Sequence, residues 1–185
     1  GSTTALTLFA NAFATGLMLY LLITILGPIS GAHMNPAETL WAVMRGDLGG
    51  RMVAAYVAAQ LAGAYAGVLL THAMFAQPLL QIAATPRPGA GLALSEGVAT
   101  FGLILTIAGA LRHAPGQLPA LVGAWIAAAF WFTGSASLAN PAVTFARMFS
   151  DTFTGIRPID APAFVLAELA AAIIAALTVG KLFPR

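Results

Sequence analysis

Long stretches of this sequence contain no charged side chain, and this property limits what the chain can fold into. Thr3–Ile29 and Leu118–Thr133 carry no Asp, Glu, Lys or Arg, and over all 185 residues only 8% are charged while 59% are hydrophobic. Soluble domains carry roughly 25% charged residues, so this chain has too few polar residues to cover a water-soluble globule. The composition therefore predicts an integral membrane protein.

The apolar stretches are long enough to cross a bilayer as helices, which takes about 20 predominantly apolar residues. Five are predicted to do so: Thr3–Ile29, Met52–Thr85, Leu92–Leu111, Leu118–Thr133 and Ala161–Leu182. Segments rich in Pro and Gly separate them. Two moderately apolar segments that open at Asn35 and Asn140 are too short to span, so we expect re-entrant or interfacial half-helices there. The predicted fold class is an all-α membrane protein.

Several classes of function are excluded by what the sequence lacks. It contains no Cys, which removes disulfides, thiolate metal sites and thiol catalysis. Its eight Lys and Arg residues do not form a basic patch, so nucleic acid is not an expected partner. His72 and His113 have no paired ligands at metal-binding spacing. No catalytic constellation can be assembled, so we expect no enzyme activity, no cofactor and no metal.

The chain repeats itself, and the repeat determines the architecture. In each half a predicted span is followed by Asn-Pro-Ala and then by a further span with a matching polar residue, Gln60 in the first half and Glu168 in the second. Because the repeated unit contains an odd number of spans, one copy is inverted relative to the other. Inverted repeats with short interrupted segments at matching places are typical of transporters and channels.

Each Asn-Pro-Ala has the residues that begin a helix. Asn is a favoured N-cap, and Pro is favoured at the first helical position because its missing N–H is not needed there. The motifs are Asn35-Pro36-Ala37 and Asn140-Pro141-Ala142. Two such helix starts meeting at the midplane would place two Asn amides beside the positive ends of two helix dipoles. That arrangement can donate hydrogen bonds to a passing oxygen while repelling cations and protons.

The paired motifs resemble those of the aquaporin and aquaglyceroporin family, the major intrinsic proteins. Glu96 with Thr100 resembles the buried Glu of that family, which accepts hydrogen bonds from a re-entrant loop. The resemblance covers essentially the whole chain and implies a single domain over 1–185. Its first half is 1–76, its second half is 92–185, and the loop 77–91 joins them. It further implies a pore in each subunit of a homotetramer, embedded in lipid, and passive flow of small neutral solutes.

The sequence departs from the family pattern at its start. The family has six spans, and the helix that precedes the one near Thr3 has no counterpart among the five spans here. That missing helix carries a Glu of its own in the family. Two alternatives to a channel therefore stay open, a non-conducting membrane fragment or assembly subunit and, less favoured, a secondary transporter.

The selectivity filter implied by the resemblance also departs from the pattern. Val143 occupies the position where the family usually has Arg, and Thr15 occupies the aromatic position. Phe130 is assigned to the filter from the fourth span, with Ala128 as the alternative if no gap is allowed, and Ser137 contributes its carbonyl. These replacements predict a wide constriction without a fixed charge, suited to glycerol or arsenous acid as well as water. The alternative is that Val143 merely packs, with Arg147 or lipid closing the site.

Two further residues are predicted to face the pore. His33, two positions before the first Asn, matches the family position that lines the vestibule. Glu38 matches Val143 by the repeat and is a candidate for the pore mouth, since charged residues inside membrane segments are usually functional. Its alternative role is to stabilise the start of a half-helix. The run Asn140–Arg147 resembles an aquaporin branch associated with bacterial arsenic-resistance clusters, so we expect a bacterial inner membrane location.

Overall fold

The computed structural model describes residues 2–183, so the first residue of the predicted first half and the last two of the second lie outside it. This part of the chain is helical and contains no strand. Its elements are α1 (Ser2–Ser30), α2 (Pro36–Arg45), α3 (Gly50–Met74), α4 (Ala90–His113), the short 3-10 helix η1 (Pro115–Gln117), α5 (Leu118–Phe132), α6 (Pro141–Arg147) and α7 (Ala161–Leu182).

Five helices are long and apolar enough to cross a membrane, which confirms the predicted all-α membrane fold. They coincide with the predicted spans except at one end. The uncharged stretch Met52–Thr85 runs into the loop predicted at 77–91, and α3 ends at Met74, just before that loop begins. Pro78 follows shortly after, and Ala83 N–H instead donates to the carbonyl of Met148 at 2.9 Å. The absence of charge alone would extend the span to Thr85, because residues 75–85 carry no charged side chain either.

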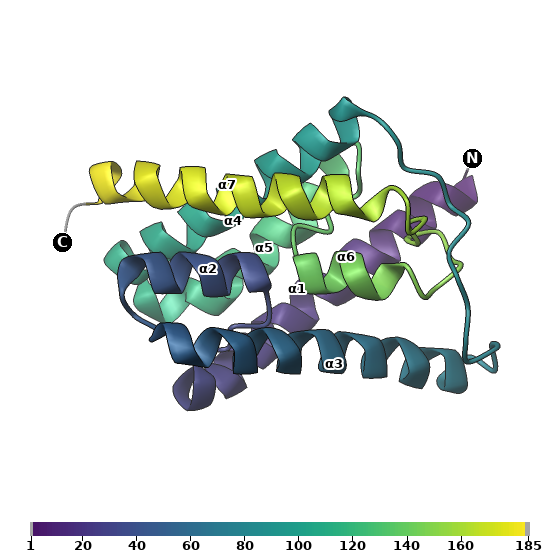
Figure 1. Ribbon diagram of the computed structural model, residues 1–185, viewed down its shortest axis with the longest axis horizontal. Coiled ribbons are helices and arrows are strands. Elements are labelled where there is room, and N and C mark those ends of the chain that lie inside the picture. Colours follow the sequence, from purple (N-terminus) through teal and green to yellow (C-terminus); the bar gives the residue numbers. More distant parts are fainter. Residues whose placement is uncertain (1, 184–185) are drawn as a thin grey trace.

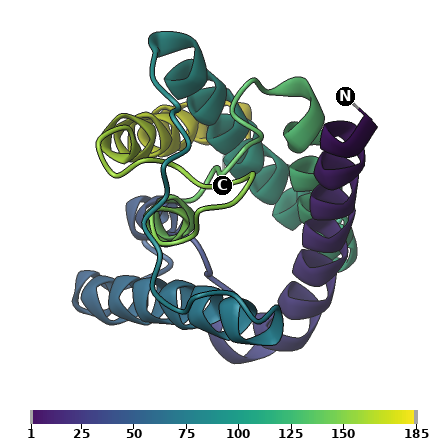
Figure 2. The ribbon, with the colours of Figure 1, turned by 90° about the vertical axis from the view of Figure 1, so that its right-hand side faces the viewer.

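The two half-helices lie between α3 and α7. Figure 1 shows α2 and α6 end to end, with their N-terminal ends toward each other and α3 and α7 on either side. Seen along the molecule in Figure 2, α1, α5 and α4 form the opposite side of the bundle. The inverted repeat predicted from the sequence produces this arrangement, since each half contributes one half-helix from its own end of the bundle.

Small residues let the long helices approach closely. A Cβ atom placed on Gly123 of α5 would lie 2.5 Å from the carbonyl oxygen of Gly16 in α1. Trp125 of α5 covers Gly102 of α4, and its indole N–H donates to the carbonyl of Ala99 at 2.9 Å. Association of membrane helices depends on such close backbone packing, because lipid supplies little hydrophobic driving force between them.

Candidate pore and selectivity site

The two Asn-Pro-Ala motifs cap the two half-helices in the same way. Asn35 and Asn140 have extended backbones, and the side-chain oxygen of each accepts a hydrogen bond at 2.9 Å from the amide two residues later. Pro36 and Pro141 occupy the first helical positions. In both motifs Asn is therefore the N-cap and Pro is the first helical residue, the positions for which these residue types are favoured.

The same two Asn side chains join the halves of the molecule. Asn35 Nδ2 donates to the carbonyl of Ala139 at 2.8 Å, and Asn140 Nδ2 donates to the carbonyl of Met34 at 3.0 Å. Each amide therefore bonds to the loop that leads into the opposite half-helix. A carboxamide NH₂ carries two protons, so each Asn keeps one donor after this crossing bond is made.

A buried carboxylate holds the second loop. Glu96 of α4 is fully buried and accepts hydrogen bonds from Leu138 N–H at 3.0 Å and Ala139 N–H at 2.5 Å. Thr100, one turn further along α4, is also fully buried, and its hydroxyl makes no hydrogen bond within the described residues. The contacts of Glu96 agree with the loop-supporting role that the resemblance implies, and Thr100 lies beside it without joining the network.

Both loops contain residues with left-handed backbones, a conformation that non-glycine residues rarely adopt. In the first loop Gly31 and Ala32 have φ values of 73° and 54°. The second loop places three further non-glycine residues there, Ala136, Ser137 and Ala139. Each such residue costs of order 1–3 kcal/mol and is found mainly where the surrounding structure enforces it, often at functional sites. Here the hydrogen bonds from the loop to Glu96 and the bonds of Asn35 and Asn140 across the two halves stabilise these left-handed conformations.

A cavity of about 170 Å³ runs past the paired Asn residues. Its wall includes all four residues predicted for the filter, Thr15, Phe130, Ser137 and Val143. The rest of the wall is largely aliphatic, from α1, α4 and α5: Leu19, Ile23, Leu103, Ile107, Leu118, Val122 and Ile126. Ala128, the alternative to Phe130, is exposed and is not part of this wall. The cavity thus has one polar side, formed by the loops, and one apolar side.

Val143 and Arg147 both line this cavity. They lie one helical turn apart on α6 and share a face. The Arg147 guanidinium donates to the hydroxyl of Thr154, which also lines the cavity. A guanidinium is therefore present near the predicted filter although Val143 occupies the expected Arg position. Spacing could have revealed it, because the i and i+4 positions of a helix face the same way.

The comparisons with known proteins decide the family. Residues 1–138 match the sequence profile described as "Major intrinsic protein". The chain belongs to the major intrinsic protein family. This agrees with the resemblance of its paired Asn-Pro-Ala motifs, and it makes the chain a channel protein of the membrane and not an enzyme.

Relatives in this family cover most of the chain. It is 54% identical over 171 residues to "Aquaglyceroporin AqpS" of Rhizobium meliloti, spanning 92% of this chain and 73% of that protein. It is 35% identical over 185 aligned positions to "Aquaporin AqpM" of Methanothermobacter thermautotrophicus, spanning 91% and 74%. A "Glycerol uptake facilitator protein" of Bacillus subtilis is 33% identical over 133 residues, spanning 63% and 47%.

The two remaining candidates of this major intrinsic protein lie in different places. Glu38 lines the central cavity, and its carboxyl group makes no hydrogen bond or ion pair within residues 2–183. His33 instead lines a separate groove between the first re-entrant loop and α3, where its ring lies 5.6 Å from that of Tyr56. The prediction that His33 faces the pore stays a prediction.

One loop residue was not anticipated from the sequence. The guanidinium of Arg87 donates to the carbonyls of Ser135, Phe153 and Gly155, at 2.6, 3.1 and 2.8 Å. Burial lowers the pKa of Arg87, an effect that the negative charge of Glu96 opposes. Arg87 thereby ties the joining loop to the segments on both sides of α6. An Arg in a Pro-rich loop gives no sequence signal for such a role.

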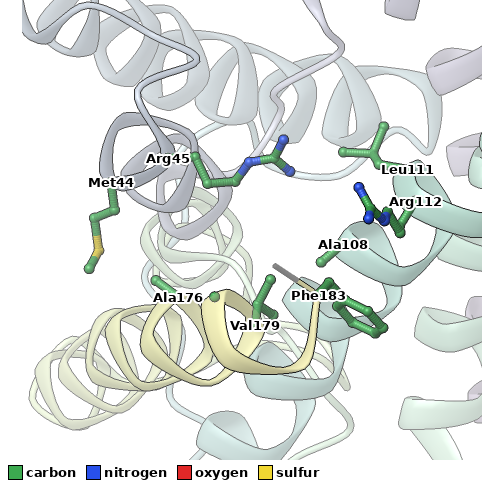
Figure 3. Close-up of a pocket in the computed structure, with 9 residues that line it drawn as sticks. Met44, Arg45, Ala108, Leu111, Arg112, Ala176, Val179 and Phe183 are labelled. Carbon is green, nitrogen blue, oxygen red and sulfur yellow. The ribbon is translucent and has the colours of Figure 1, made fainter. Parts of the chain in front are cut away.

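A second cavity, of about 510 Å³, lies at the C-terminal end of α2. Figure 3 shows Arg45 and Arg112 reaching toward it from different helices, with Phe183 beside them. Arg45 also pairs with Asp47 at 2.8 Å and lies over the ring of Trp41. The length of α2, about 15 Å at 1.5 Å per residue, separates this cavity from the level of Asn35. No group of three or more His, Asp or Glu side chains suited to a metal ion occurs among residues 2–183.

Proposed function

We propose that this protein is a passive channel for small neutral solutes, with glycerol-type polyols, water and arsenous acid as candidates. The observation that supports it is the central cavity, which brings Asn35 and Asn140 together with all four predicted filter residues. The names of the relatives, which include an aquaglyceroporin and a glycerol uptake facilitator, favour the same solutes.

The two-sided wall of the cavity suits a polyol. The C–H face of a polyol can lie against the aliphatic side chains of α4 and α5 while its hydroxyl oxygens accept hydrogen bonds from the loops. Such a pocket, apolar with a few placed polar groups, is the usual form of a small-molecule site. With Thr15 and Val143 in place of an aromatic residue and an Arg, the constriction has room for a solute larger than water.

Proton exclusion follows from the direction of the hydrogen bonds at the Asn pair. The oxygens of Asn35 and Asn140 are engaged as helix caps, so only N–H donors remain for the pore. A water between them accepts at its oxygen and points its own protons away, which interrupts the chain of donors and acceptors that proton conduction needs.

Two of the spanning helices, α1 and α3, expose large apolar side chains such as Leu6, Phe9 and Leu70. Such surfaces suit lipid or neighbouring subunits, and we propose a homotetramer in a bacterial inner membrane. Native mass spectrometry of the detergent-solubilised protein tests the tetramer, and a monomer there would exclude it.

Light scattering from liposomes after a glycerol jump tests the channel. Fast shrinkage followed by fast reswelling, relative to empty liposomes, is the expected result. Fast shrinkage without accelerated reswelling would mean a pore for water alone and would refute the wide constriction. Rates equal to those of empty liposomes, with the protein shown to be inserted, would support a non-conducting subunit instead. Solute flux that requires an ion gradient would support a secondary transporter.

A further inference from the structure

Glu38 is the acidic side chain in the wall of the central cavity, and nothing in the described structure engages it. The other charged side chain there, Arg147, is already hydrogen-bonded to Thr154. Glu38 lies in the first turn of α2, three residues after Asn35. Positions three apart share a helix face, which accounts for the presence of both residues in one cavity wall.

The hydrogen-bonding groups around Glu38 complement it. Asn35 and Asn140 offer only donors to the cavity, because their oxygens cap the half-helices. Arg147 has donors only. A carboxyl group keeps an acceptor oxygen in either protonation state, so Glu38 adds a side-chain acceptor to a wall that also holds the hydroxyls of Thr15, Ser137 and Thr154. A solute hydroxyl, which both accepts and donates, can be satisfied on both sides only where donors and an acceptor lie together.

The direction of side chains on a helix brings these groups to a similar depth. Helical side chains point back toward the helix N-terminus, so the carboxyl of Glu38 reaches toward the level of Asn35. One hydroxyl of a polyol can then accept from Asn35 while a neighbouring hydroxyl donates to Glu38. Two water molecules that meet these groups separately each lose their own freedom, whereas a polyol carries both hydroxyls on one frame and loses less entropy in binding.

We infer that Glu38 is a specificity-determining residue of the pore, which accepts a hydrogen bond from a hydroxyl of polyhydroxylated solutes and favours their passage over that of water. This inference rests on the proposed channel function. A carboxylate that served only to stabilise the start of α2 would need no place in the cavity wall, because the helix dipole acts equally on solvent-facing positions of the first turn.

The test compares two substitutions at Glu38 in reconstituted liposomes, with glycerol and water permeabilities measured on the same preparation. Glu38→Val installs the residue that its repeat partner Val143 carries and removes the acceptor. Glu38→Gln keeps the shape and one carbonyl acceptor. We expect Glu38→Val to lower the glycerol-to-water permeability ratio by about fivefold, the factor that one net hydrogen bond gives, and Glu38→Gln to lower it less.

Water permeability serves as the internal control for folding and insertion. A ratio in Glu38→Val within twofold of the unmodified protein would overturn the inference, and so would a parallel loss of both permeabilities, which indicates a structural role. If Glu38→Val does not insert, Glu38→Ala removes the same acceptor and carries the same expectation. An unmodified protein that passes water but not glycerol would refute the proposed polyol channel itself, whereas unaltered variants of a glycerol-conducting protein would refute only the role of Glu38.

Discussion

At the scale of single residues, Glu96 shows how a side chain completes a loop that regular structure cannot. The loop before α6 adopts left-handed backbones at Ala136, Ser137 and Ala139, so its amides have no helical or strand partners. Two of these amides, at Leu138 and Ala139, donate to the Glu96 carboxylate. Buried N–H groups must be satisfied somewhere, and here one buried side chain satisfies two of them.

Substitution of Glu96 by Ala should therefore destabilise the protein. Two buried amides lose their acceptor, at about 1–3 kcal/mol for each unsatisfied group, and we expect a clearly lower apparent melting temperature in detergent. Glu96→Gln retains one acceptor oxygen, so its melting temperature should lie between those of Glu96→Ala and the unmodified protein. Ser95→Ala is the matched control, because half-buried Ser95 accepts a single backbone hydrogen bond, from Gly134 N–H at 3.2 Å. Equal melting of Glu96→Ala and the unmodified protein would contradict this role.

At the scale of elements, the contact of α1 with α5 depends on two glycines. A Cβ on Gly123 would meet the carbonyl oxygen of Gly16 at 2.5 Å, and backbone atoms cannot move aside as a flexible side chain can. Gly123→Ala must push the helices apart, at a cost of about 1–3 kcal/mol for overpacking, and we expect a lower melting temperature and altered glycerol flux, since both helices line the pore.

Gly63 of α3 provides the control for this substitution. A Cβ there has nothing within 4 Å inside the described chain, so Gly63→Ala should leave the melting temperature unchanged or raise it through its higher helix propensity. Both variants replace Gly by Ala within a spanning helix and differ only in what the added methyl group meets. A similar loss of stability in the two would show that the α1–α5 approach is not the cause.

The loops outside the membrane are joined by a carboxylate whose ionisation can be tested. Asp160 accepts hydrogen bonds from the Arg157 side chain at 2.9 Å and from Arg87 N–H at 2.8 Å, and these bonds lower the pKa of Asp160 below its ordinary 3.8. A lowered pKa means that the contribution to stability is present above pH 3.8 and is lost as the pH falls through the lowered value. We expect Asp160→Asn to melt below the unmodified protein at neutral pH, and the difference to shrink in strong acid. A difference that stays constant with pH would exclude ionised Asp160 as its source.

The positions of the spanning helices could be predicted from the sequence, whereas the contacts of the loops could not. The spans follow from hydropathy, which reports what lipid tolerates, so four of them agree closely with the structure. The uncharged stretch alone overruns the end of α3 at Met74, because residues 75–85 are uncharged without being helical, whereas the Pro-rich loop predicted at 77–91 lies close to that end. The role of Arg87 could not be predicted, since it depends on three carbonyls from distant loops that only the folded chain brings together.

At the scale of the whole molecule, the inverted repeat is visible in the hydrogen bonds as well as in the sequence. Gln60 and Glu168 were matched by the repeat alone, and each contacts the half-helix of its own repeat. Gln60 donates to the hydroxyl of Thr39 at 2.8 Å and to the carbonyl of His33 at 2.7 Å. Glu168 instead accepts from the hydroxyl of Thr144 at 2.8 Å and from Asn140 N–H at 3.1 Å.

The two copies thus hold equivalent loops with hydrogen bonds of opposite direction. Sequence comparison of the halves could locate these positions and favours Glu168 as an acceptor, but it could not assign the direction at Gln60, because a carboxamide can both donate and accept. The direction depends on which backbone group each re-entrant loop turns toward the helix. In the first half it is the carbonyl of His33, and in the second it is the amide of Asn140.

This reversal predicts that exchanging the two side chains has unequal effects. Glu168→Gln keeps a carbonyl oxygen that can accept from Thr144 and Asn140, so we expect a loss of less than about 1 kcal/mol. Gln60→Glu places a buried carboxylate against the carbonyl of His33. The nearby hydroxyl of Thr39 already donates to the carbonyl of Asn35, so the variant should cost about 3–5 kcal/mol as a poorly compensated buried charge. Thermal melting of both variants in the same detergent measures the difference. Equal losses of stability would mean that the two halves use these positions interchangeably. A Gln60→Glu variant more stable than the unmodified protein would reverse the hydrogen-bond direction assigned at Gln60, because a carboxylate stabilises only a site that offers donors.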